Sequence, residues 1–174
     1  MTEKAPVRTS KRDGLLDTIE NIFTGGYGKK EDLREIDKAL RDLYFNELRE
    51  LRHRWEKVYL AVLDAGQSNL GRGFKQAIQS LDRITSSIQR ADYGYAGLMD
   101  RTVKIREEAL SRVLEYDRTL IASIDGLKSG VASVEKAVDG GSWAQLQSAL
   151  GSVKESLKEM GERWRAREGV LNQS

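Results

Sequence analysis

The longest helical pattern of the chain runs from Tyr95 to Val138 and reads YAGLMDRTVKIREEALSRVLEYDRTLIASIDGLKSGVASVEKAV. Apolar or small side chains return along it at steps of mostly three and four residues, as one face of an α-helix requires. At about 1.5 Å per residue, such a helix is roughly 66 Å long. We therefore expect one very long helix, around which shorter helices pack.

Composition favours an all-α protein over one that contains a sheet. Hydrophobic residues make up 39% of the chain and charged residues 32%, and the single proline is Pro6. Abundant helix formers without proline are typical of long helices and coiled coils. The absence of cysteine excludes disulfides and thiolate metal sites, and a net charge of only +2 disfavours a dedicated nucleic-acid binder. With no membrane-length apolar run and no signal segment, we expect a cytoplasmic protein.

The remaining helices are expected at 30–64, 69–91 and 143–168, in one bundle domain that covers 29–170. Gly66 and the pair Gly140-Gly141 are the expected helix stops. Residues 171–174 are expected to fray at the end of the chain. The sequence therefore predicts an elongated antiparallel helical bundle with coiled-coil-like packing.

Residues 1–28 are expected to form a basic, flexible arm that contains one short amphipathic helix. Five apolar residues of the arm share one helical face: Leu15, Leu16, Ile19, Ile22 and Phe23. Because so short a helix is unstable alone, this face must dock on the body of the protein, on a partner or on a membrane. The arm's cations Lys4, Arg8, Lys11 and Arg12 would favour nucleic acid or anionic lipid.

Short connections imply that neighbouring helices pair in antiparallel fashion. Aligning the apolar stripes around Gly66, Gly94 and Gly140 divides the long helix near Tyr116. The helices 30–64 and 69–91 then cover its front half, and the helix 143–168 covers its back half. We therefore expect a three-helix bundle at the front and a bare two-helix hairpin at the back.

The back hairpin carries small residues that allow backbones to approach closely. These candidate self-association residues are Ser123, Gly126, Gly130, Ser133, Ala137, Ser148 and Ser152. One interpretation is simply a tight hairpin. We predict the other, a homodimer through residues 117–164 in which two hairpins form a four-helix bundle.

Two further groups of side chains are candidates for a partner surface. Tyr44, Phe45, Tyr93 and Tyr95 fall level with one another and form either a cap on the bundle or an exposed patch, since tyrosine is enriched at interfaces. Near the C-terminus, Trp164 is expected in the core, with Arg163, Arg165 and Arg167 at its rim.

No catalytic, cofactor or metal site emerges from the sequence. His53 is the only histidine and is flanked by arginines, which repel a metal ion. The apolar stripes read as almost free of ionisable residues, so no polar pocket is expected in the bundle. We therefore expect a non-enzymatic scaffold, adaptor or assembly subunit that acts through protein–protein association. The alternative is a peripheral membrane or nucleic-acid-associated protein that uses the basic N-terminus.

Overall fold

The computed structural model describes residues 11–25, 29–91 and 94–172. These residues form six α-helices and one 3-10 turn, and they contain no strand. The elements, in chain order, are α1 (Lys11–Gly25), α2 (Lys30–Asp64), η1 (Ser68–Leu70), α3 (Gly71–Arg90), α4 (Gly94–Leu98), α5 (Val103–Asp139) and α6 (Trp143–Leu171). The predicted all-α helical bundle is confirmed. None of the helices in these ranges is long and apolar enough to cross a membrane.

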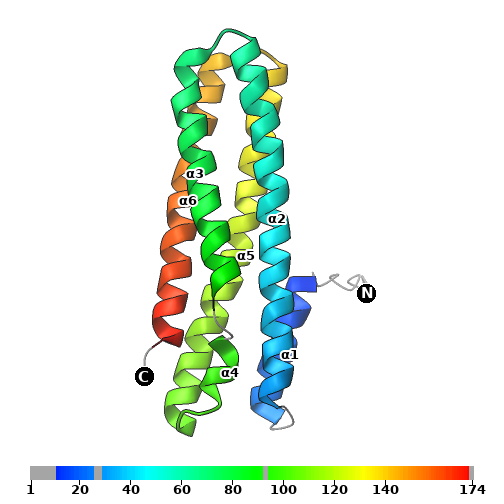
Figure 1. Cartoon of the computed structure of the whole chain (residues 1–174), viewed down its shortest axis with the longest axis vertical. Helices are drawn as coiled ribbons and strands as arrows, with labels where there is room; N and C mark the ends of the chain where they lie inside the picture. Colours follow the sequence, from blue (N-terminus) through cyan, green and yellow to red (C-terminus); the bar gives the residue numbers. More distant parts are fainter. Residues whose placement is uncertain (1–10, 26–28, 92–93, 173–174) are drawn as a thin grey trace, which may run out of the picture.

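Two antiparallel hairpins, α2–α3 and α5–α6, lie side by side and form a four-helix bundle (Figure 1). Their turns lie together at one end of the bundle, which we call the closed end. As a result α2 runs parallel to α5, where Arg54 bonds Glu135 at 2.8 Å. Likewise α3 runs parallel to α6, where Lys154 Nζ donates to Gln76 Oε1 at 2.8 Å. The opposite end, with α4 and the first turns of α2 and α5, is called the open end.

The predicted helix stops are confirmed at the closed end. Gly66 and Gly141 adopt left-handed backbone angles, with φ of 76° and 64°. In each turn the next residue donates its N–H back across the helix end, from Gln67 to the Val62 carbonyl at 3.1 Å and from Ser142 to the Ala137 carbonyl at 2.9 Å. This is the Schellman pattern, in which glycine avoids the penalty of a Cβ atom at positive φ.

The single helix predicted from Tyr95 to Val138 is wrong, because the chain breaks between α4 and α5. The N–H groups of Met99, Asp100 and Arg101 bond to the carbonyls three residues earlier, which ends α4 in a tight turn. Leu98 is fully buried, whereas Ile105 of the predicted stripe is 54% exposed. The hydrophobic spacing continues across the break, so spacing alone does not show it. The residues on the two sides nevertheless lie in different surroundings, one buried and the other exposed.

This break also makes the predicted front and back halves wrong. The helix α3 packs on α6 and not along α5, and α2 packs on both α3 and α5. The chain passes through α4 toward the open end before α5 begins, and α5 then runs back along α2 (Figure 1). The hairpin α5–α6 is therefore covered by α2–α3, and a bare two-helix hairpin does not occur.

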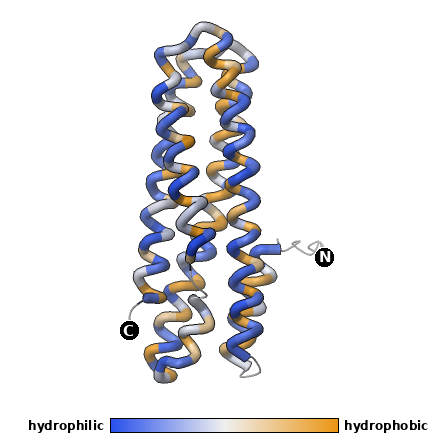
Figure 2. Tube along the Cα trace, in the orientation of Figure 1, coloured by the Kyte–Doolittle hydropathy of each residue, from blue (hydrophilic) through white to orange (hydrophobic). Residues whose placement is uncertain are grey.

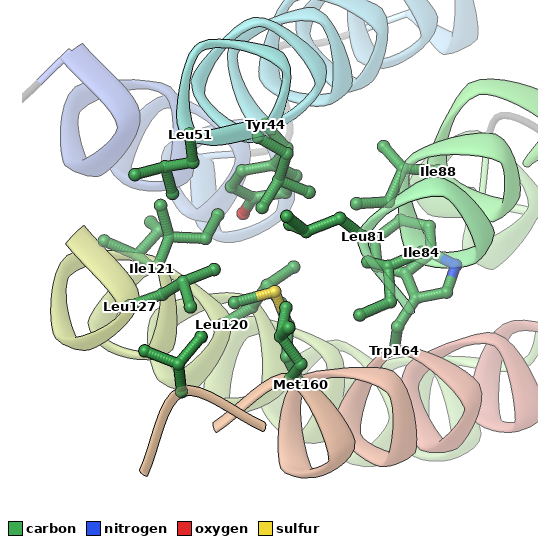
Figure 3. Packing of buried hydrophobic residues seen from close by; sticks show 14 of the residues in the cluster. Tyr44, Leu51, Leu81, Ile84, Ile88, Leu120, Ile121, Leu127, Met160 and Trp164 are labelled. Carbon is green, nitrogen blue, oxygen red and sulfur yellow. The ribbon is translucent and has the colours of Figure 1, made fainter. Parts of the chain in front are cut away.

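One apolar core runs through the bundle, and hydrophobic residues recur along each helix (Figure 2). Side chains from all four long helices point into the shared interior, among them Leu51, Leu81, Leu127 and Met160 (Figure 3). Trp55 of α2 lies 4.6 Å from the Phe74 ring of α3 and donates its indole N–H to the Phe74 carbonyl at 3.2 Å. The predicted antiparallel pairings of α2 with α3 and of α5 with α6 are thus confirmed.

Candidate functional site

A layer of charged side chains crosses the core between the middle of the bundle and its open end. Asp37 of α2, Asp117 of α5 and Arg167 of α6 are at most 1% exposed. Buried charges cost free energy unless partners neutralise and hydrogen-bond them. Their partners therefore show how this layer holds the helices together.

Arg167 links three helices through its guanidinium group. Its Nε donates to Asp117 Oδ1 at 2.9 Å, and its Nη2 donates to Asp37 Oδ1 at 3.1 Å. Nη1 donates to the neighbouring Glu168 at 2.8 Å. The same group lies 4.7 Å from the ring centroid of Trp164, within the range of a cation–π contact. Every nitrogen of the guanidinium is thus bonded, and one arginine ties α6 to α2 and α5.

The two aspartates are completed by side chains from α2 and α4. Asp117 accepts hydrogen bonds from the hydroxyl groups of Tyr44 and Tyr95. Asp37 accepts from Arg41 Nε at 3.1 Å, and Arg41 Nη1 in turn donates to the Ala91 carbonyl just after α3, at 2.5 Å. Among the described residues, no buried side-chain nitrogen or oxygen is left without a hydrogen-bond partner. The layer therefore joins α2, α4, α5, α6 and the end of α3.

Burial and the charges of neighbouring groups together set the pKa values in this layer. Burial raises the pKa of Asp37 although the charges of Arg167 and Arg41 oppose the shift. Burial and the negative charge of Asp117 raise the pKa of both Tyr44 and Tyr95 well above the usual value for tyrosine. For Arg167, burial alone would lower the pKa, but the charges of Asp117 and Asp37 outweigh it and the pKa is raised. The arginine therefore stays charged and the two tyrosines stay neutral hydrogen-bond donors.

The sequence interpretation missed this layer. Arg167 is not at the rim, and the statement that the stripes are almost free of ionisable residues is wrong. A signal was present, because the buried positions of α5 run 113, 117, 120, 124, 127, 131 and 134 at steps of four and three. Those of α6 continue through 157, 160, 164 and 167 in the same way. Asp117 and Arg167 thus occupy core positions of regular heptads. A stripe chosen by hydrophobicity alone assigns these core positions to neighbouring apolar residues instead.

The predicted aromatic group is split by the structure. Tyr44 and Tyr95 do meet, but both are fully buried with their hydroxyl groups on Asp117, so for them the exposed patch is wrong. Phe45 is partly buried. Tyr93 lies outside the described residues.

The predicted amphipathic helix of the N-terminal arm is α1, and its apolar face docks on the body of the protein. It packs against α2 and α5, where Leu16 is 1% exposed and Ile19 is fully buried. Leu15, Ile22 and Phe23 are partly buried against the same core. Of the three docking alternatives, the structure therefore shows the intramolecular one.

Charged contacts surround this apolar face of α1. Arg12 bonds Glu47 of α2 at 3.0 Å and Asp125 of α5 at 2.9 Å. Farther along, Arg118 of α5 bonds Glu20 of α1 at 3.0 Å. Arg12 is thus held between two carboxylates from two helices and does not belong to an exposed basic patch. Lys4 and Arg8 of the predicted arm lie outside the described residues.

The candidate self-association residues fall into two groups in the structure. Ser123, Gly130 and Ala137 lie at least partly buried in the bundle, and a Cβ atom added to Gly130 would lie 3.1 Å from a Val153 methyl group. This close approach fits the tight-hairpin interpretation. The exposed members are Gly126, Ser133, Ser148 and Ser152. The premise of an uncovered hairpin is wrong, and self-association through these residues stays a prediction.

The C-terminal helix extends one residue into the tail that was expected to fray. Val170 is buried, and Arg101 Nη2 donates to the Val170 and Leu171 carbonyls at 3.2 and 2.8 Å. Arg101 therefore caps the end of α6 from the turn that follows α4.

Over the described ranges, no three His, Cys, Asp or Glu side chains gather as metal ligands would. The expectations that the chain needs no metal and no cofactor stay predictions. Comparison with protein-family models, with curated proteins and with solved structures gives no match for this chain.

Proposed function

We propose that this chain is a non-enzymatic helical adaptor or assembly subunit that acts by protein–protein association, and that its partner is a second copy that exchanges α1. The observation that supports this proposal is the docking of α1 outside a four-helix bundle that is already complete. The groove between α2 and α5 accepts an amphipathic helix and satisfies both its apolar face and its charges.

The contact between α1 and the bundle has the composition of a protein interface. Its centre is apolar, with Leu16 and Ile19 fully or almost fully buried. Its periphery is charged, with Arg12 between Glu47 and Asp125 and the exposed pair Arg118–Glu20. Interfaces commonly combine an apolar core, a polar rim and an arginine anchor. This composition supports the proposal that the groove, which α1 occupies here, is a recognition surface.

Exchange between two copies would keep every one of these contacts. The α1 of a second copy carries the same leucine, isoleucine and arginine, so the groove binds it equally well. A helix of 15 residues is marginal in water on its own, so α1 needs a groove in either arrangement. Protein concentration then decides between the closed monomer and the exchanged dimer.

Light scattering at micromolar concentration tests the proposal. The intact chain is expected to show a species of twice the 19.6 kDa chain mass, in a proportion that grows with concentration. The pair Leu16→Asp and Ile19→Asp should abolish that species, because two carboxylates cannot enter the apolar groove. Thr18→Asp and Asn21→Asp add the same charge on the exposed side of α1 and should leave it intact.

Two results would contradict exchange of α1. One is a monomeric mass at every concentration. The other is a dimer that survives the Leu16 and Ile19 substitutions but is lost on Ser133→Arg and Ser148→Arg. That second result would assign association to the exposed small residues of the α5–α6 hairpin instead.

A further inference from the structure

A hollow of about 210 Å³ lies between α3 and α6 on the outside of the bundle. Its walls are formed by Ser80 and Arg83 of α3 and by Lys158 and Arg165 of α6. The buried side chains of Ile84 and Leu157 contribute to its lining. The two helices are parallel here, so groups of both face one opening.

The charge of this hollow is one-sided, since three cations line it and no carboxylate does. Two other hollows on the bundle are mixed. In one of them Arg112 and Arg163 are accompanied by Glu115. In the other, Arg54 and Lys57 are accompanied by Glu135 and Asp139, and Arg54 bonds Glu135.

The three cations of the α3–α6 hollow also lack the carboxylate partners found elsewhere. Among the ion pairs of the described residues, none includes Arg83, Lys158 or Arg165. Arg83 Nε donates only to the Gln79 carbonyl of its own helix, at 3.4 Å. Glu162, on the same helix as Lys158, is exposed and does not line the hollow. Like charges held together across two helices repel one another, so an anion between them is favoured.

A glycine keeps the hollow open. A Cβ atom added to Gly161 would lie 3.8 Å from Arg165 Nη1 and 3.8 Å from Ile84 Cγ1, which is ordinary contact distance. A short side chain therefore fits the backbone here, whereas a long one must extend into the hollow. This position allows the hollow to be filled without removing a charge.

We propose that the α3–α6 hollow, lined by Arg83, Lys158, Arg165 and Ser80, binds a phosphate group. Guanidinium groups bind phosphate oxygens through paired N–H donors, lysine adds a compact positive charge, and a serine hydroxyl donates a further hydrogen bond. The phosphate is either that of a small soluble phosphate ester or that of a lipid headgroup. This site is independent of α1, which packs on α2 and α5.

Titration of the full chain with pyrophosphate, followed by amide NMR shifts at constant ionic strength, tests the soluble form. Saturable shifts are expected at Ser80, Gly161 and Arg165. Arg83→Gln with Arg165→Gln should weaken binding by at least about tenfold, which corresponds to the loss of about one charged hydrogen bond. Arg72→Gln with Lys75→Gln removes the same charge from exposed positions of α3 outside the hollow and should change binding far less.

Gly161→Leu separates the shape of the site from its charge. It keeps every cation, suits a helix better than glycine and places a side chain in the hollow, so binding should weaken as much as in the double arginine variant.

Co-sedimentation with phosphatidylcholine vesicles, with and without phosphatidic acid, tests the lipid form with the same variants. Binding in either assay that Gly161→Leu abolishes supports the site, and the assay that responds identifies the source of the phosphate.

The proposal is overturned if neither probe binds saturably. It is also overturned if the Arg72 and Lys75 control weakens binding as much as the hollow variants, because attraction would then be a property of the whole surface. Light scattering of the same variants separates this result from the exchange of α1, since none of the substituted residues belongs to α1 or its groove.

Discussion

At the closed end of the bundle the helices meet through apolar heptads and finish in glycine turns. Toward the open end they meet through the charged layer, the short helix α4 and the docked α1. Apolar heptads are generic, and the same stripes fit several arrangements of neighbouring helices. Arg167 is more selective, because it must reach Asp37 on α2 and Asp117 on α5 together. We infer that the charged layer selects the arrangement and that the apolar end supplies most of the stability.

The largest expected effect comes from breaking the charged layer. Arg167→Met leaves Asp37 and Asp117 buried without their shared counter-ion, which should lower the free energy of unfolding by about 3–5 kcal/mol. Arg163→Met, one turn earlier and partly exposed, should cost about 1 kcal/mol or less. Urea denaturation of both variants measures the difference. Similar losses for the two variants would show that the layer is no more critical than a surface pair.

A smaller effect is expected when one hydrogen bond of the layer is removed. Tyr95→Phe leaves Asp117 Oδ2 without the hydroxyl of α4 and should cost about 1–3 kcal/mol, the penalty for a buried acceptor that loses its partner. Tyr44→Phe removes a longer bond of 3.3 Å and should cost less. Chemical denaturation orders the two, and the opposite order would mean that Tyr44 is the main donor to Asp117.

The same two tyrosines should make the protein less stable at alkaline pH. Their pKa values are raised on folding, so the unfolded chain loses these protons first. Their stabilising contribution is complete below about pH 10 and declines as pH rises further, by at most about 1.4 kcal/mol per pH unit for each group. Unfolding by urea between pH 9 and 11 measures this slope. The variant Tyr44→Phe with Tyr95→Phe should flatten it, and an unchanged slope would assign the effect to other groups.

The smallest effects should have opposite signs in the turn at the closed end and in the middle of α5. Gly141→Ala places a side chain at a φ of 64° and should destabilise by about 1–2 kcal/mol. Gly126→Ala lies in a helix with nothing within 4 Å of the new Cβ and should stabilise by about 0.4–1 kcal/mol. Thermal or urea unfolding distinguishes the two signs. A loss of stability in Gly126→Ala would indicate that this position needs close backbone approach, as a self-association face would.

The parts of the fold that follow from local rules were predictable from the sequence. Helix spacing, the stops at Gly66 and Gly141 and the two antiparallel hairpins depend on neighbouring residues alone. The break between Leu98 and Val103 was not predictable in this way, because apolar spacing continues across it. Its cause is tertiary, since Tyr95 and Leu98 enter the bundle while Arg101 bonds the end of α6.

The charged layer was only partly accessible to sequence reasoning. The heptads of α5 and α6 place Asp117 and Arg167 at core positions, so the pattern indicated that these charges are buried. It did not indicate which helices they join. That pairing depends on how the α2–α3 and α5–α6 hairpins pack on one another, which the spacing of a single helix does not contain.

The position of Arg167 late in the chain has a consequence for the order of events during synthesis. Asp37 and Asp117 emerge long before their shared counter-ion, and a buried carboxylate without a counter-ion is unfavourable. The α2–α3 hairpin can pair early, but closing the open end of α2 against α5 leaves Asp37 and Asp117 without their shared counter-ion until α6 is complete. The arrangement of the hairpins is therefore fixed last, when all four long helices are present.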